Sequence, residues 1–249
     1  MCFDTDSAPP VRAIAGAAVS HDELTLTAAD GNRFRAFLAA PESPAARGVV
    51  IYPDVRGLYR FYEELALRFA ERGIAAIAFD YFGRTAGLGP RDDDFEHAPH
   101  VDQTTDDGVQ ADARAAVGRL RGLGTEFVFS IGFCFGGRAS WVGAASGLGL
   151  AGSIGFYGSP TRRRGGPSVI ERIDAIECPI LALQAGDDAG ITAEDNAAFE
   201  QALSGAGVEH EIVVYEGAPH SFFDRKQDQF ADASADAWRR VLAFVDAHA

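Results

Sequence analysis

The sequence predicts an α/β protein with a mostly parallel central sheet, helices on both faces and an antiparallel N-terminal hairpin. Apolar, β-prone runs alternate with helical patterns along nearly the whole chain, and this alternation is typical of parallel sheets. Residues 23–27 and 33–38 instead alternate polar and apolar side chains around Asp30-Gly31-Asn32, which predicts the hairpin. We find no internal repeat and no interdomain linker, so we expect one domain over residues 1–249, with 1–20 as an N-terminal arm.

After the hairpin, strands and helices follow in turn. The uninterrupted apolar run at residues 48–52 predicts a strand that is covered on both faces. Further strands are predicted at residues 74–79, 127–131, 154–157, 179–184 and 211–215. Apolar positions at helical spacing predict helices at residues 62–72, 109–120, 193–203 and 228–247, with another starting near Arg138. Residues 81–106 contain several Gly, Pro and Asp residues and are expected to form a long loop, which is often a functional feature.

The composition narrows the classes of function. With 249 residues, 47% of them hydrophobic, the chain is long enough to bury a sizeable core. Its net charge of −14 argues against nucleic acid and anionic membranes as partners. No apolar stretch is long enough to span a bilayer, and no signal-peptide pattern is present at the N-terminus. Cys2, Cys134 and Cys178 are too few for a disulfide framework and lack metal-ligand spacing. We therefore expect a cytoplasmic protein without a metal or cofactor.

The segment 132–137, Gly-Phe-Cys-Phe-Gly-Gly, is the most informative part of the chain. It lies between a predicted strand and a predicted helix, as in a nucleophile elbow, where glycines permit a sharp turn that exposes the central side chain. Cys134 holds that position, and a helix N-terminus favours a thiolate. The glycine spacing also matches a phosphate-binding loop, but Arg138 and Ala139 replace the Lys and Ser/Thr that this loop requires. A structural, buried cysteine in a glycine-rich turn is the other alternative.

Two later segments supply the partners that a nucleophile needs. In α/β enzymes with an elbow, an acid and then a histidine follow on loops at the carboxyl ends of later strands. Asp187 and Asp188 follow the strand predicted at 179–184. His220 follows the strand predicted at 211–215, in a loop with Gly and Pro. The order and the setting therefore predict a nucleophile, an acid and a base.

A second group of polar residues suggests a different site. His97 and His100 lie beside three aspartates at 92–94, a set of side chains that could hold a metal ion. No regular element is predicted there to hold them in place. We therefore interpret this segment as an exposed acidic loop.

Taken together, the motifs resemble those of the dienelactone hydrolases (carboxymethylenebutenolidases), which have the α/β-hydrolase fold. The matching segments are the elbow, Ala-Gly-Asp-Asp at 185–188 and Gly-Ala-Pro-His-Ser-Phe at 217–222. Two further segments agree, Tyr-Pro-Asp-Val-Arg-Gly-Leu at 52–58 and Phe-Asp-Tyr-Phe-Gly-Arg at 79–84. The resemblance extends over about residues 20–247 and implies hydrolysis of a carboxylic ester or lactone.

Residue by residue, the resemblance implies a triad of Cys134, His220 and Asp188, with the acid at the last position of its segment. It also implies an oxyanion hole formed by the backbone N–H groups of Val55 and Phe135. Donors placed where negative charge develops stabilise the transition state of acyl transfer. The resemblance thus predicts a complete hydrolytic site.

Four other residues are candidates for substrate binding or for control of the thiol. Asp54 corresponds to an acidic residue beside the family's cysteine, where well-studied members have Glu. The family holds a substrate carboxylate with arginines, which can bind it bidentately. Arg84 matches one of these arginines, whereas Arg225 lies one residue beyond the second. Arg56 is an additional candidate.

The implied reaction proceeds through a thioester between the acyl group and Cys134, which water activated by His220 then hydrolyses. We expect a small-molecule ester or lactone as the partner, and a monomer or a small homo-oligomer. A general short-chain esterase of the same fold is one alternative. Another is a non-catalytic protein that binds small molecules or senses oxidants through Cys134. The ordered acid and base argue against a sensor.

Overall fold

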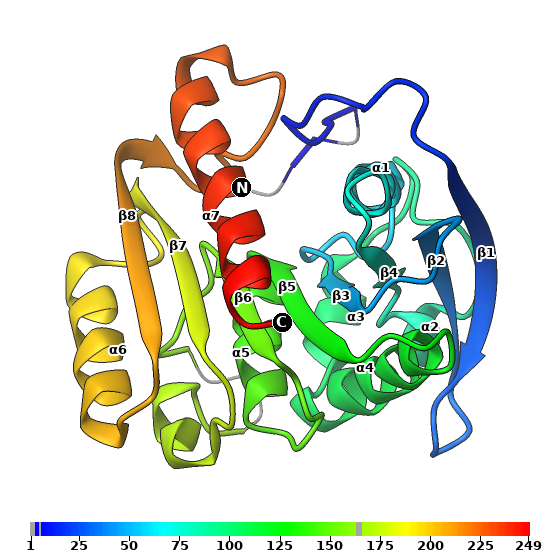
Figure 1. The fold of residues 1–249 in the computed structure, drawn as a ribbon. Coiled ribbons are helices and arrows are strands. Elements are labelled where there is room, and N and C mark those ends of the chain that lie inside the picture. Colours follow the sequence, from blue (N-terminus) through cyan, green and yellow to red (C-terminus); the bar gives the residue numbers. More distant parts are fainter. Residues whose placement is uncertain (1–2, 5, 163–165) are drawn as a thin grey trace.

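The computed structural model describes residues 3–4, 6–162 and 166–249, so Cys2 lies outside the described residues. Within them, eight strands form one sheet in the order β1-β2-β4-β3-β5-β6-β7-β8 (Figure 1). The pairs β1–β2 and β2–β4 are antiparallel, and all other neighbours are parallel. The strands are β1 (Val19–Thr27), β2 (Arg33–Pro41), β3 (Arg47–Tyr52), β4 (Ala75–Phe79), β5 (Phe127–Phe133), β6 (Gly152–Phe156), β7 (Ile180–Asp187) and β8 (His210–Pro219). The predicted fold class, including the N-terminal hairpin, is confirmed.

Helices cover both faces of the sheet. Figure 1 shows α1 and α7 on one face and α4, α5 and α6 on the other. The helices are α1 (Arg60–Ala70), α2 (Gly83–Ala86), α3 (Ala98–Gln103), α4 (Asp106–Arg121), α5 (Phe135–Ala144), α6 (Ala193–Ala206) and α7 (Ala231–Ala247). Short 3-10 turns lie at Ile170–Ala175 and Asp228–Phe230. The central strands are therefore enclosed between two helical layers, as their apolar sequences predict.

Successive side chains of the central strands pack into two separate hydrophobic cores, one on each face of the sheet. In β3, Val49 and Ile51 pack into the cluster that includes residues of α1 and α7. Val50 and Tyr52 point the other way, into the cluster that includes residues of α4. This alternation follows from the pleat of a strand, which turns neighbouring side chains to opposite faces. It holds the strand ends rigidly between the two layers.

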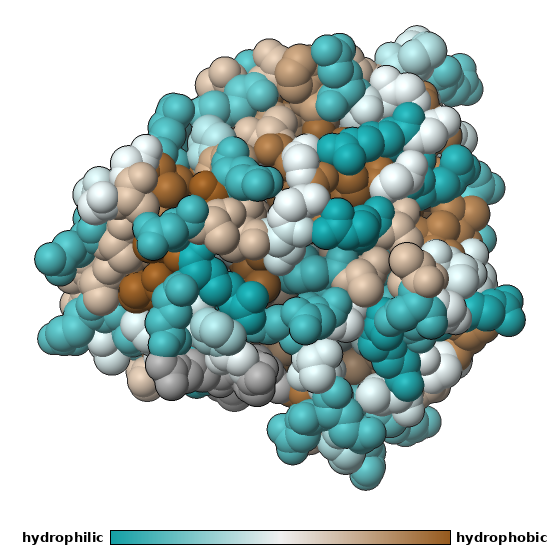
Figure 2. Space-filling model, turned by 90° about the horizontal axis from the view of Figure 1, so that it is seen from below, coloured by the Kyte–Doolittle hydropathy of each residue, from teal (hydrophilic) through white to brown (hydrophobic). Residues whose placement is uncertain are grey.

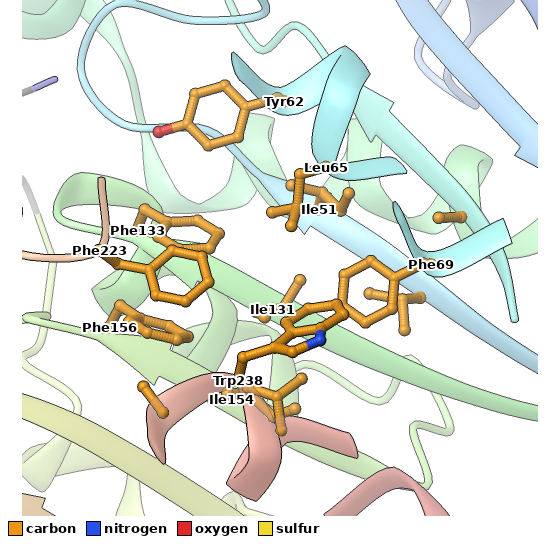
Figure 3. Packing of buried hydrophobic residues seen from close by; sticks show 14 of the residues in the cluster. Ile51, Tyr62, Leu65, Phe69, Ile131, Phe133, Ile154, Phe156, Phe223 and Trp238 are labelled. Carbon is orange, nitrogen blue, oxygen red and sulfur yellow. The ribbon is translucent and has the colours of Figure 1, made fainter. Parts of the chain in front are cut away.

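An aromatic stack lies under the carboxyl ends of β5 and β6. Phe133 stacks on Phe156 with ring centroids 4.8 Å apart, and Phe223 lies 4.9 Å from Phe156 (Figure 3). Figure 3 also shows Trp238 of α7 and Phe69 of α1 beside each other, farther along the same core. Because Phe133 immediately precedes Cys134, this stack supports the elbow from below.

The segment predicted as a long loop at residues 81–106 is only partly irregular. It contains α2 and α3, and Pro99 lies in the first turn of α3, where proline is well tolerated. Arg91 reaches from this segment to Asp80 at the end of β4 and forms a buried ion pair of 2.7 Å. The segment is thus attached to the sheet by a contact that its sequence pattern does not reveal.

The surface is consistent with the acidic composition. Figure 2, which views the molecule from below relative to Figure 1, shows hydrophilic residues spread over this face, with apolar residues in several smaller patches. Along the part of the chain that the structure describes, no helix combines the length and the apolar character needed to cross a membrane.

Candidate active site

Cys134 lies in a strained turn between β5 and α5. Its φ of 56° and ψ of −113° are unusual for a residue with a side chain, and its N–H donates to the carbonyl of Phe156 at 3.0 Å. The turn requires the flanking glycines. A Cβ on Gly132 would lie 1.9 Å from the Gly136 carbonyl oxygen, and a Cβ on Gly136 would lie 2.1 Å from the Tyr52 carbonyl oxygen. The thiol is therefore held at the N-terminus of α5 by a backbone that only glycine permits.

Strand pairing brings Asp188 and His220 together. β7 and β8 extend farther than the sequence pattern predicts, and beyond an irregularity at 185–187 Asp187 pairs with Pro219. Asp188 immediately follows β7 and His220 immediately follows β8, so the two side chains meet at the same edge of the sheet. Nδ1 of His220 lies 2.5 Å from Oδ2 of Asp188. This contact leaves Nε2 of the imidazole directed away from the carboxylate.

The carboxylate of Asp188 is held in its ionised form. Its burial opposes the charge, but hydrogen bonds from His220 and from the Gly190 N–H, at 2.8 Å, outweigh that effect, so the pKa of Asp188 lies below its ordinary value. An ionised acid at this position orients the imidazole and stabilises its protonated form.

Cys134, Asp188 and His220 line a single cavity of about 90 Å³. The complete lining is Val55, Cys134, Phe135, Arg138, Tyr157, Ser159, Arg162, Asp188, Gly190, Ile191 and His220. The structure thus brings together the three residues predicted as nucleophile, acid and base.

The turn after β3 contributes Val55 to the same cavity. β3 and β5 are parallel neighbours, and Tyr52 pairs with Gly132. The residues that follow these two strands therefore lie side by side, with Val55 on one and Phe135 on the other lining the cavity. Their shared position is what an oxyanion hole formed by two backbone N–H groups requires.

Asp54 is buried next to this turn but does not line the cavity. Its Oδ1 accepts the Arg56 N–H at 2.9 Å, and its Oδ2 accepts the Tyr59 hydroxyl at 3.2 Å. Burial raises the pKa of Asp54 to about 6, against the effect of these donors. Asp54 is therefore a buried acid whose charge changes in the mildly acidic range.

The three arginines singled out in the sequence do not line the cavity. Arg84 forms ion pairs with Asp30 and Asp112. Arg56 donates from Nη1 to the Phe3 carbonyl at 2.6 Å. Arg225 lines a different cavity. Each of these guanidinium groups thus has a position in the structure outside the lining of the candidate site.

Two other arginines do line the cavity. Arg138 is buried, and its guanidinium binds both carboxylate oxygens of Asp106, at 2.6 and 2.9 Å. The backbone of Arg162 is attached at two points, through its N–H to Ser159 Oγ at 3.2 Å and through its carbonyl to Arg138 Nε at 2.9 Å. Arg162 is exposed, and together with hydrogen bonds from Thr192 and Thr161 its charge lowers the pKa of Asp195. Of the two lining guanidinium groups, that of Arg162 is the more open to solvent.

Tyr157 is a further lining residue that the sequence pattern does not single out. It follows β6 with a φ of 37°, and its ring centroid lies 4.9 Å from that of His220. Its place at the carboxyl end of a central strand was the available signal, because ligands of parallel sheets bind at that edge.

The histidines of the acidic loop have another environment. His100 stacks on Phe95 with centroids 5.2 Å apart. Over residues 3–4, 6–162 and 166–249, no three His, Cys, Asp or Glu side chains gather so that they could hold a metal ion. Cys178 is buried at the start of β7, as expected of a core residue, and burial raises the pKa of its thiol to about 12.

Comparison with known proteins identifies relatives over nearly the whole chain. A protein of Yersinia pestis named "Putative carboxymethylenebutenolidase" is 27% identical over 237 residues, which cover 92% of this chain and 89% of the relative. A Synechocystis protein with the same name is 31% identical over 206 residues, or 78% and 82% of the two chains. A Klebsiella pneumoniae crystal structure described as "Putative Dienelactone Hydrolase" superposes with a TM-score of 0.82 at 25% identity, covering 92% of this chain and 99% of that one.

A family model agrees with these relatives. The model described as "Dienelactone hydrolase family" matches residues 34–249, a range that includes every residue of the candidate triad and cavity lining. The chain therefore belongs to the dienelactone hydrolase family, a family of hydrolases with the α/β-hydrolase fold.

Proposed function

We propose that this protein hydrolyses a small carboxylic ester or lactone through a thioester on Cys134. The observation that carries the proposal is the 2.5 Å contact between His220 and Asp188 in a cavity that Cys134 also lines. A nucleophile at a strained elbow with an oriented base is the arrangement that acyl transfer needs.

In the first step, Sγ of Cys134 bonds to the carbonyl carbon. Nδ1 of His220 faces Asp188, so Nε2 takes the thiol proton, and Asp188 stabilises the resulting imidazolium. The tetrahedral oxyanion accepts hydrogen bonds from the N–H groups of Val55 and Phe135, each contributing about 3 kcal/mol. The oxyanion then collapses, the bond to the alkoxy oxygen breaks, and His220 protonates the departing alcohol.

In the second step, water hydrolyses the thioester. His220 accepts a proton from the water as its oxygen bonds to the acyl carbon, and the oxyanion forms again between Val55 and Phe135. Collapse breaks the bond between carbon and sulfur and releases the acid. The thiolate recovers the proton from His220. A lactone follows the same course, but ring opening leaves the alcohol on the acyl chain, so this step releases a single hydroxy acid.

The lining of the cavity also suggests a preference among substrates. Arg162 adds an exposed positive charge to the cavity in a protein whose net charge is −14. A carboxylate on the substrate would bind a guanidinium there, and can do so bidentately. From the sequence, Arg84, Arg56 and Arg225 were the candidates for this role. Because Arg84 is instead engaged in ion pairs with two carboxylates, we assign the role to Arg162.

The test is hydrolysis of p-nitrophenyl acetate by four variants. Cys134→Ala should lose turnover, whereas the matched control Cys178→Ala, which removes a core thiol, should retain it in the folded protein. His220→Ala should slow both steps, because the same imidazole takes the thiol proton and activates water, so any acetyl group that does reach Cys134 should persist and be seen by mass spectrometry of the intact protein. His210→Ala serves as its control. Full activity in Cys134→Ala would contradict the proposal.

A further inference from the structure

The N-terminal arm lies against two of the segments that build the cavity. Figure 1 shows the described part of the arm, drawn in dark blue, passing between the loop before α7 and α1 before it reaches β1. Although the arm has little sequence pattern, Phe3, Ala8 and Val11 are buried, with exposed fractions of 2%, 5% and 7%. A segment that buries several apolar side chains is a packed part of the molecule rather than a loose end.

Phe3 packs among residues that adjoin the candidate triad. Its ring stacks on Phe61 of α1, with centroids 4.0 Å apart, and lies 6.2 Å from Phe133 and 6.3 Å from Tyr157. Phe133 immediately precedes Cys134, and Tyr157 packs against the imidazole of His220. The Phe3 ring therefore packs near Phe133, which precedes the nucleophile, and near Tyr157, which packs against the base.

The same residue is attached to the turn that carries Val55. Arg56 donates from its guanidinium to the Phe3 carbonyl at 2.6 Å. On the other side of the turn, the backbone N–H of Phe3 lies close enough to the Asp54 carboxylate to favour its charged form. The arm thus binds both residues that flank Val55.

A second attachment fastens the loop after His220. Ser7 donates from Oγ to Oδ2 of Asp224 at 2.6 Å, and the Arg225 N–H donates to the Ala8 carbonyl at 3.0 Å. Asp224 is itself buried and accepts the Lys226 N–H at 3.0 Å. The arm therefore joins the loop of the base to the turn of the oxyanion hole, two segments 165 residues apart in the chain, from Val55 to His220.

We propose that the arm is a clasp that sets the spacing between Val55 and His220, with Phe3 and Ser7 as positioning residues. The clasp rests on the function proposed above, because its purpose is to hold the base and the oxyanion donors in register with Cys134. Displacement of such groups by about 1 Å lowers turnover by as much as about 100-fold. Phe3 and Ser7 do not themselves touch the substrate, since neither lines the cavity.

The experiment compares Phe3→Ala, Ser7→Ala and the double variant with wild type in ester hydrolysis. Leu203→Ala is the control, because it truncates a buried side chain of α6 in a separate core that contains no residue of the arm. We expect kcat to fall by roughly 10- to 100-fold in each single variant, with KM nearly unchanged because ground-state contacts remain. The double variant should lose less than the product of the two effects, since both break one clasp. Ser7→Thr, which retains the hydroxyl, should keep most of the activity.

Amide hydrogen exchange supplies a readout that does not depend on turnover. In Phe3→Ala and Ser7→Ala, exchange should rise at residues 54–57 and 221–227 while the central strands stay protected; this also shows that the variants are folded. Faster exchange in both segments with unchanged kcat would overturn the clasp. Lower kcat with unchanged exchange would overturn it too. If wild type hydrolyses no ester, the proposed function fails, and the exchange data alone decide whether the arm fastens the two segments.

Discussion

Arg84 binds both oxygens of the buried Asp112 carboxylate, with Nε 3.2 Å from Oδ2 and Nη2 2.8 Å from Oδ1. Asn32 also donates to Oδ1, at 2.9 Å, and Asp30 pairs with the same guanidinium. Burial raises the pKa of Asp112 to about 6 in spite of these partners. The arginine that the family resemblance assigns to the substrate therefore neutralises a buried acid.

The first prediction concerns the stability of this pair. Arg84→Met should destabilise the protein by roughly 3 kcal/mol at pH 7, because it leaves Asp112 buried without its cation. Arg84→Met combined with Asp112→Leu should recover much of the loss, since it removes the isolated charge as well. Urea unfolding measures the free energy of unfolding of the single and the double variant. A selective loss of activity on carboxylated esters, without loss of stability, would instead show that Arg84 binds the substrate carboxylate.

The second prediction follows from Asp54. Its pKa rises from 3.8 to about 6 on folding because the carboxyl is buried, so the folded protein binds more protons than the unfolded chain between these values. Stability must then fall as pH rises through this range. At about 1.4 kcal/mol for each pH unit, Asp54→Asn should gain up to roughly 3 kcal/mol relative to wild type between pH 4 and pH 7. Urea unfolding of both proteins across that range tests the slope, and parallel curves would show that Asp54 does not titrate there.

The third prediction concerns the glycines of the elbow. Gly136→Ala would place a Cβ 2.1 Å from the Tyr52 carbonyl oxygen, so the turn must open and Cys134 must move. We expect near-complete loss of activity and a lower melting temperature. Gly118→Ala is the control, because that glycine lies on the exposed side of α4 with nothing within 4 Å. It should stabilise the helix by about 0.5–1 kcal/mol. Thermal unfolding and ester hydrolysis separate the two.

Local patterns explain why so much of the site could be predicted. The elbow is a short strand–turn–helix sequence, and its glycines are required by contacts within a few residues or with the neighbouring strand. The order of the elements was enough to single out His220 and to leave Asp187 and Asp188 as candidate acids, and the family resemblance then selected Asp188. The contact between Asp188 and His220 was harder to predict from the sequence, because it depends on the extra pairing of Asp187 with Pro219 beyond an irregularity in the strands.

Long-range contacts explain what could not be predicted. Arg84 and Arg162 are both arginines in polar segments, and only the fold determines that one meets Asp112 while the other lines the cavity. The arm shows the same limit. Phe3 has no periodic neighbours in the sequence, and its packing against Phe61 and Phe133 arises from the tertiary structure alone.

The fourth prediction concerns the acid of the triad. Asp188→Asn keeps the size of the side chain but removes the charge that orients His220, so kcat should fall on the order of 10³-fold. The variant should remain folded, because Asn keeps the shape of the side chain and its Oδ1 can still accept the Gly190 N–H. Asp187→Asn is the matched control, since Asp187 is the neighbouring carboxylate in β7. A larger loss in Asp187→Asn than in Asp188→Asn would reverse the assignment of the acid.

The final prediction concerns the choice of substrate. Arg162→Met should raise KM for esters that carry a carboxylate by roughly 10-fold or more, the loss expected when a charge-assisted hydrogen bond is removed. Neutral esters such as p-nitrophenyl acetate should be hydrolysed as by wild type. Arg162→Lys should restore only part of the affinity, because an ammonium group cannot bind a carboxylate bidentately. Since Arg162 is exposed, raising the salt concentration should weaken the preference of wild type in the same direction. Equal losses on both classes of ester would mean that the Arg162 side chain shapes the cavity without selecting a carboxylate, since the Met variant keeps the backbone contacts with Ser159 and Arg138, and that another group determines the substrate.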